Sequence, residues 1–131
     1  MMLQIHITEN QYFGDLMNIF YLSDLGKKLI FEVFVGIKDV DLYVVFGDSD
    51  IVGIYDAIVN EVYRVKPYSI NIIDNTLVIS SFIPKNEVYI IKEVCLYDSN
   101  NDIFVGRCVL DESVVKFDNS TLTANITMVI K

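Results

Sequence analysis

Residues 89–110, YIIKEVCLYDSNNDIFVGRCVL, hold two apolar runs on either side of the polar cluster Asp98-Ser99-Asn100-Asn101-Asp102. Apolar runs separated by a short cluster of turn-forming residues are typical of a β-hairpin. Lys92 and Glu93 interrupt the first run, and one cysteine stands on each side of the turn. The stretch therefore predicts a hairpin, and it raises three alternatives for its role: an active site, a disulfide-linked pair, or the edge of an assembly.

The rest of the second half of the chain also predicts strands. Apolar residues alternate with polar ones from position 122 to 130, which is typical of a strand with one buried face. Asp74-Asn75 predicts a turn, and Pro84 ends the apolar run of residues 77–83. The strands that we expect here span residues 70–73, 77–83, 88–97, 103–110 and 122–130.

The first half of the chain predicts two helices between short strands. Phe13, Leu16, Met17 and Phe20 recur at helical spacing, and Gly26 is expected to end that helix. A second apolar series at helical spacing follows Gly47-Asp48-Ser49-Asp50, and its members are Ile51, Ile54, Tyr55, Ile58 and Val62. Strands are expected at 3–7, 29–35 and 40–46. The predicted fold class is therefore α+β, with two N-terminal helices packed on a mostly antiparallel β-sheet and a strand-rich C-terminal half.

Length and charge limit the classes of function. A chain of 131 residues suits one domain, 1–131, and its formal net charge of −8 disfavours nucleic acid as a partner. No apolar run is long enough to span a bilayer, and the N-terminus does not resemble a signal peptide. We therefore expect a soluble protein made in a cytoplasm, with no membrane partner and with reduced cysteines.

No set of residues has the spacing of a catalytic, cofactor or metal site. His6, the one histidine, has no Ser or Cys partner at an arguable spacing and is better explained as an exposed strand residue. The polar cluster 98–102 lacks the glycine and distal glutamate of a calcium loop and is explained as a turn. Asp48-Ser49-Asp50 is explained as a helix cap, and Asp39, Asp41, Asp48 and Asp50 as a solvated acidic edge rather than a cluster.

The two cysteines allow three interpretations. Cys95 and Cys108 are too few for a zinc site with a single histidine. In a tight hairpin centred on Asn100-Asn101, Cys95 would face Gly106 rather than Cys108, which disfavours a disulfide. Buried free thiols are therefore the favoured interpretation.

Several phrases together resemble the N-terminal domain of bacteriophage tail-collar fibre proteins. The order of elements agrees, and the phrases span almost the whole chain. They are ITENQYFGDLMNIFYLSDLGKKLIFEVFVG, VVFGDSDIVGIYDAIVNEVYRVKPYSI, NTLVISSFIP and YIIKEVCLYDSNNDIFVG. Cys95 stands where the family usually has glycine, the first helix lacks the usual small residues, and no fibre shaft follows Lys131.

The resemblance implies a non-enzymatic structural protein of a phage tail or tail-like particle. Such a protein would be made in the bacterial cytoplasm and would attach a fibre or receptor-binding protein to the baseplate, with baseplate and tail-fibre proteins as partners and a homotrimer as a possible state. Glu93 and Lys92 would lie on the outward or interfacial side of the hairpin. Alternatively, such a charge protects a strand edge, or Glu93 or Arg64 forms an ion pair within or between chains.

Two other functions remain open from the sequence. The first is a small-molecule or carbohydrate-binding module, or a small enzyme, on an α+β scaffold; several tyrosines gathered with two or more carboxylates in a concave site would favour it. The second is a tail-fibre assembly chaperone, which would be missing from the finished particle.

Overall fold

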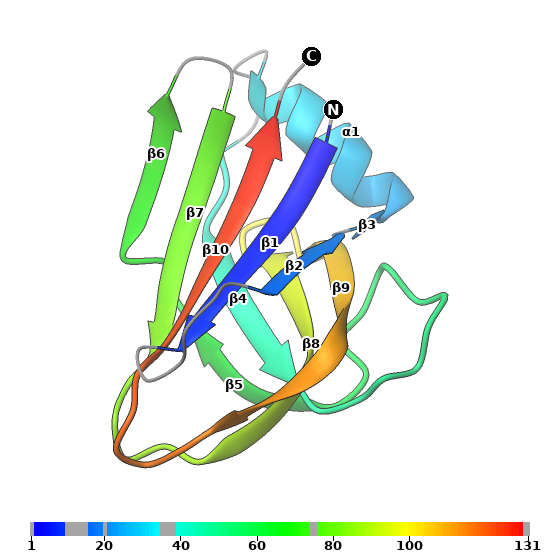
Figure 1. The fold of residues 1–131 in the computed structure, drawn as a ribbon. Coiled ribbons are helices and arrows are strands. Elements are labelled where there is room, and N and C mark those ends of the chain that lie inside the picture. Colours follow the sequence, from blue (N-terminus) through cyan, green and yellow to red (C-terminus); the bar gives the residue numbers. More distant parts are fainter. Residues whose placement is uncertain (1, 10–15, 20, 35–38, 74–75, 130–131) are drawn as a thin grey trace.

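The computed structural model describes residues 2–9, 16–19, 21–34, 39–73 and 76–129. Within them the chain forms two five-stranded antiparallel sheets and one helix, α1 (Asp24–Phe34) (Figure 1). Sheet A has the order β2-β1-β10-β7-β6, and its strands are β1 (Met2–Glu9), β2 (Leu16–Ile19), β6 (Ser69–Ile73), β7 (Thr76–Ile83) and β10 (Leu122–Val129). Sheet B has the order β3-β9-β8-β4-β5, and its strands are β3 (Tyr21–Leu22), β4 (Leu42–Gly47), β5 (Glu61–Val65), β8 (Tyr89–Asp98) and β9 (Ile103–Lys116).

One hydrophobic core lies between the two sheets. Sheet A contributes residues such as Ile79 and Ile126, and sheet B contributes Phe46 and Leu96, all in a single cluster of buried side chains. Helix α1 adds Leu29 and packs against β9. Alternating residues of two sheets that meet in this way form a β-sandwich core.

The strand predictions for the second half are confirmed. The strands β6 to β10 lie where alternation and turn signals place them, and every strand pair in the two sheets is antiparallel. The predicted strands at 3–7 and 40–46 correspond to β1 and β4. The β-rich, mostly antiparallel fold is therefore established, and β10 lies at the centre of sheet A between β1 and β7.

The prediction of two helices at 13–20 and 51–62 is wrong in the described residues. Residues 16–19 are strand β2, which pairs with β1, while residues 10–15 and 20 lie outside the described part of the chain. Residues 48–60 contain no helix or strand, and residues 61–65 are strand β5. Helical spacing of apolar residues is a weak signal when contacts distant in sequence hold the backbone otherwise.

The helix that does form lies where a strand was predicted. Ser23 caps α1, because its Oγ accepts a hydrogen bond from Gly26 N at 2.9 Å and its carbonyl accepts one from Lys27 N at 3.0 Å. Gly26 was expected to end a helix, but it lies in the first turn of α1. A Cβ at Gly26 would overlap the backbone of Val105, so the glycine allows the helix to approach β9 closely. The β-branched and aromatic composition of residues 29–35 was therefore overridden by the cap and by packing.

Candidate functional site

The most unusual feature of the described residues is a loop, residues 48–60, that covers the outer face of sheet B. Figure 1 shows it as a long excursion between β4 and β5. Val94 and Leu96 point into the core, so Glu93 and Cys95 point to the opposite face, because side chains alternate along a strand. Glu93 and Cys95 are nevertheless 0 % exposed, and the thiol of Cys95 lies 3.8 Å from the carbonyl oxygen of Ala57 in the loop. The loop therefore shields this face of the sheet from water.

Glu93 holds both ends of the loop through its carboxylate. Its Oε2 accepts hydrogen bonds from the backbone amides of Ser49 at 3.0 Å and Asn60 at 2.9 Å. Its Oε1 accepts one from the amide of Val59 at 2.8 Å. A charged acceptor makes stronger hydrogen bonds than a neutral one, so this single side chain clamps the two ends of loop 48–60 together.

Arg107 neutralises this carboxylate and holds the middle of the loop. Its Nε donates to Glu93 Oε1 at 2.9 Å, and the two side chains are 1 % and 0 % exposed. Its terminal nitrogens donate to the carbonyl oxygens of Ile51 at 2.6 Å, Ile54 at 3.3 Å and Ser49 at 3.3 Å. A buried ion pair is tolerable only when its remaining donors and acceptors are satisfied, and here the loop backbone satisfies them.

Gly47 makes room for the clamp. It pairs with Glu93 across β4 and β8, and a Cβ at position 47 would overlap the Glu93 carboxylate. Any larger residue would therefore displace the carboxylate from the amides that it binds.

The held loop exposes apolar side chains at its tip. The exposed fractions are 54 % for Ile51, 76 % for Val52 and 40 % for Tyr55. Gly53, between them, has φ of 88°, a left-handed conformation that favours glycine. Residues 48–60 contain three aspartates and no lysine or arginine. The loop thus presents an apolar tip with an acidic surround, in a conformation that the buried ion pair fixes.

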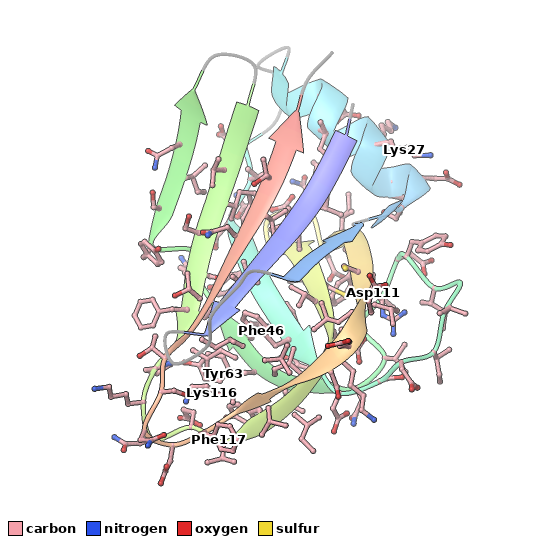
Figure 2. The ribbon with its side chains drawn as sticks, viewed as in Figure 1. Lys27, Phe46, Tyr63, Asp111, Lys116 and Phe117 are labelled. Carbon is pink, nitrogen blue, oxygen red and sulfur yellow. The ribbon has the colours of Figure 1, made fainter. Side chains whose placement is uncertain are left out.

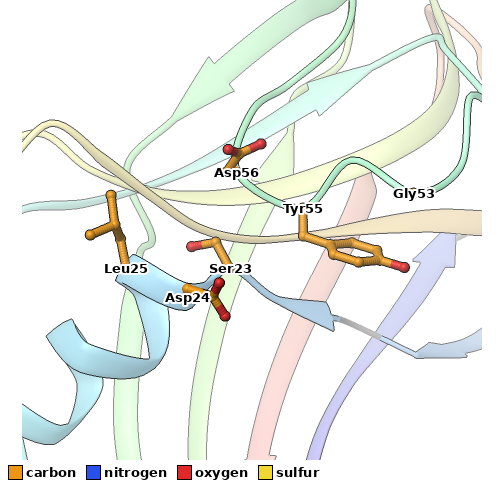
Figure 3. Close-up of a pocket in the computed structure, with 6 residues that line it drawn as sticks. All are labelled: Ser23, Asp24, Leu25, Gly53, Tyr55 and Asp56. Carbon is orange, nitrogen blue, oxygen red and sulfur yellow. The ribbon is translucent and has the colours of Figure 1, made fainter.

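A pocket of about 280 Å³ lies between the loop and the start of α1 (Figure 3). It is lined by Ser23, Asp24, Leu25, Gly53, Tyr55 and Asp56. Asp24 and Asp56 are both exposed, whereas Ser23 is buried and occupied by the helix cap. The pocket therefore offers one aromatic ring and two carboxylates.

Glu93 is not where the resemblance implies, whereas Lys92 is half-buried on β8. Glu93 is buried rather than outward, and β8 lies between β9 and β4, so the charge does not protect a strand edge. Arg64 forms an ion pair with Glu61 at 2.8 Å on the surface and lies over the ring of Tyr97. The structure thus places both Glu93 and Arg64 in ion pairs within the chain. The partner of Glu93 is Arg107, which the sequence analysis did not identify.

The two cysteines are buried free thiols, as expected, but their register differs from the prediction. Cys95 lies opposite Arg107, because the pairing of β8 and β9 shifts by one residue between Leu96 and Tyr97. Cys108 belongs to the core between the sheets, so the two thiols lie on opposite faces of sheet B. Burial raises the pKa of both thiols, that of Cys108 to about 12, which keeps them protonated and poorly nucleophilic.

The polar cluster 98–102 forms the hairpin turn. Asp98 is fully buried, and its Oδ1 accepts hydrogen bonds from the amides of Asp41 at 2.9 Å and Asn100 at 3.1 Å. Asp98 thus serves as a turn residue of the hairpin, as the turn interpretation of the cluster predicts. The pKa of Asp41 is lowered by hydrogen bonds from Ser99 and then from Lys66.

The other acidic residues do not gather. Asp41 precedes β4 and Asp48 follows it, which separates them by roughly 20 Å along the strand. No group of three or more metal-ligating side chains occurs among the described residues. Asp48-Ser49-Asp50 caps no helix and instead opens loop 48–60. His6 lies in β1 opposite Asn125, as the strand prediction requires.

Comparisons with protein-family models, curated proteins and solved structures give no match to this chain. In the described part of the chain, no helix has the length and apolar character that crossing a membrane requires.

Proposed function

We propose that this protein is a non-enzymatic structural component that works by protein–protein assembly. The setting that we propose is a phage tail or phage-tail-like particle, in which the protein attaches a fibre or receptor-binding protein to the baseplate. That setting rests on the sequence resemblance. The observation that supports assembly as the mode of action is the apolar tip of loop 48–60, which is exposed although the loop is firmly held.

The apolar tip suits a contact surface. Complete burial of a valine or isoleucine side chain stabilises a complex by about 1.5–3 kcal/mol, and Val52 and Ile51 both have more than half of their surface left to bury. Tyrosine is among the residues that contribute most to interfaces, and Tyr55 is 40 % exposed. A loop that is already ordered loses little entropy on binding.

The buried charges support a structural role for this site. In the part of the chain that the structure describes, the side-chain hydrogen bonds of Glu93 and Arg107 run to one another or to the backbone of the loop. The pair is thus engaged in holding the loop.

Site-specific cross-linking in assembled particles tests this function. A photo-reactive residue is placed at Val52, and the same residue at Ile70, which is 52 % exposed on β6, serves as the control. We expect cross-links from position 52, and not from position 70, to a fibre or baseplate protein of particles from the source of the chain. Absence of the chain from purified particles would overturn the proposal and would favour the assembly chaperone.

The pocket beside α1 gives partial support to a second candidate, a carbohydrate-binding module, because it has the two carboxylates that the sequence criterion asks for but one tyrosine rather than several. Tyr55 offers a ring for stacking, and Asp24 and Asp56 offer acceptors for sugar hydroxyl groups. Titration with glucose, galactose and N-acetylglucosamine, followed by NMR, would show shifts at residues 23–25 and 53–56 that Tyr55→Ala abolishes. An unchanged spectrum with all three sugars would contradict this candidate.

A further inference from the structure

The outer face of sheet A carries an exposed aromatic pair at one end. Tyr68, just before β6, and Phe82, near the end of β7, are 60 % and 40 % exposed. Their ring centroids lie 5.6 Å apart, and the ring planes are tilted by 56°. The backbone amide of Tyr68 donates to the carbonyl oxygen of Ser80 at 2.9 Å, which holds Tyr68 beside β7. Aromatic side chains that stay in water in an ordered position mark a contact site.

A shallow pocket of about 270 Å³ is lined by both rings and by Thr121 and Thr123 at the start of β10. Thr123 is the direct partner of Phe82 across β10 and β7. Leu122 and Ala124, on either side of Thr123, are buried in the core, so Thr123 points to the outer face with Phe82. The pocket therefore combines two aromatic rings with hydroxyl groups.

The sheet face that continues from the pocket is polar but uncharged. The strand register places Ser69, Ser80 and Asn125 in one row across β6, β7 and β10, and Asn71 and Thr127 in the next row. Strands β6, β7 and β10 contain none of the 10 basic and 18 acidic residues of the chain, whereas β5, β8 and β9 each contain two or more. The described outer face of these three strands thus offers hydrogen-bonding groups without a net field.

The charged residues that flank these strands offset one another. Lys66 forms an ion pair with Asp41 at 3.2 Å. Lys85 and Asp118 carry opposite charges on adjacent segments, because the amide of Asn86 donates to the carbonyl oxygen of Asp118 at 2.6 Å. The surround of the pocket therefore favours neither an anionic nor a cationic ligand.

A neutral sugar matches these features. Its ring has apolar C–H faces that can stack on aromatic rings, and its hydroxyl groups both donate and accept hydrogen bonds. Hydroxyl and amide side chains also do both, whereas a carboxylate only accepts and an ammonium group only donates. A protein partner fits less well, because protein interfaces are depleted in serine, and this face carries Ser69 and Ser80.

We propose that the Tyr68–Phe82 pocket and the adjoining outer face of β6, β7 and β10 bind a neutral oligosaccharide. The pocket is slightly smaller than the roughly 300–1,000 Å³ of sites for drug-sized ligands, so it suits one sugar ring, and the following sugars lie over Ser80 and Asn125. Strands β6 and β7 lie on the other side of the molecule from Asp111 and loop 48–60 (Figure 2). A bound glycan therefore leaves the apolar loop tip available for assembly.

An array of immobilised glycans, followed by NMR titration, tests the site. The array carries neutral oligosaccharides of glucose, galactose, mannose and N-acetylglucosamine beside sialylated and sulfated ones. We expect retention on neutral glycans, and the same glycan in solution should shift the backbone signals of residues 68–71, 80–82 and 121–125. Absence of binding to every neutral glycan, preference for the charged glycans, or shifts confined to other residues would overturn the inference.

Ring-removing variants test the role of the aromatic pair. Tyr68→Ala and Phe82→Ala should each weaken binding by about tenfold or more, and Phe82→Trp, which keeps a stacking ring, should retain it. Tyr55→Ala is the matched control, because Tyr55 is also 40 % exposed but belongs to loop 48–60. Wild-type affinity in Tyr68→Ala and Phe82→Ala would overturn the inference. Loss of binding in Tyr55→Ala alone would also overturn it and would favour the pocket beside α1. Circular dichroism checks that each variant is folded, and the NMR map of the wild type needs no variant.

The outcome is separable from that of the proposed function. A chain that binds no glycan but cross-links through position 52 to another particle protein would retain the assembly function and overturn only the sugar site. A chain that binds glycans but is absent from purified particles would do the reverse.

Discussion

Replacement of Arg107 by methionine should destabilise the protein far more than an ordinary surface substitution. The side chain is 1 % exposed and forms one hydrogen bond to Glu93 and three to loop carbonyl oxygens. Methionine fills much of the same volume but leaves the Glu93 carboxylate buried without its counter-charge. Removal of one partner from a buried ion pair costs about 3–5 kcal/mol, a large fraction of the roughly 5–15 kcal/mol by which a domain is stable.

Urea unfolding followed by far-UV circular dichroism measures this cost. With a slope of about 1.5 kcal/mol per molar urea, the midpoint should fall by about 2–3 M. The matched control is Arg64→Met, which breaks the Arg64–Glu61 pair, where both side chains are 34 % exposed. That pair should contribute no more than about 1 kcal/mol.

A double variant separates the charge from the packing. Glu93→Met combined with Arg107→Met removes both charges, so it should be less destabilised than the sum of the two single variants. Equal costs for Arg107→Met and Arg64→Met, or strict additivity in the double variant, would refute the claim that the buried pair holds loop 48–60.

Three further predictions follow from the packing. Gly26→Ala should cost more than about 2 kcal/mol in urea unfolding, because its Cβ overlaps the backbone of β9, whereas Lys27→Ala on the same helix should change stability by less than about 0.5 kcal/mol. Burial raises the pKa of Cys108 to about 12, so its contribution to stability is complete below the ordinary thiol pKa near 9 and should be lost as the pH rises toward 12. The urea midpoint of the wild type should therefore fall between pH 8 and 10, and Cys108→Val should lessen that fall. An identical fall in the variant would contradict the assignment. Asp98→Ala leaves two backbone amides of the turn without their acceptor and should cost about 1–3 kcal/mol by thermal unfolding, against less than about 0.5 kcal/mol for the exposed Asp118→Ala.

Local signals in the sequence sufficed for the strands of the second half. Alternation from 122 onward and the turn at 98–102 depend on neighbouring residues, and both survive in β10 and in the β8–β9 hairpin. The helix predicted at residues 51–62 was wrong because contacts distant in sequence determine the conformation of loop 48–60. Its apolar residues have helical spacing, but its backbone groups bind Glu93 and Arg107, which lie 33 to 58 positions away in the chain. No local pattern records such a partner.

The sequence does hold a signal for Arg107 as the ion-pair partner of Glu93. A single arginine inside the apolar run FVGRCVL, on the strand predicted to pair with the one that carries Glu93, is a signal for a buried ion pair. The resemblance to tail-fibre domains pointed away from this, because it placed Glu93 at an interface. The exposure of the loop tip could not be predicted, since apolar interface residues and core residues have the same sequence pattern.

The position of β10 between β1 and β7 determines when sheet A can be completed during synthesis. Ile5 of β1 pairs with Ile126 of β10, so about 120 residues must be translated before β1 gains this neighbour, roughly 6–24 s at ordinary elongation rates. The β6–β7 and β8–β9 hairpins join strands close in sequence and can form earlier. A nascent chain therefore carries β1 with one unpaired edge for seconds, and mispairing of that edge with a neighbouring chain is the stage of folding most open to aggregation.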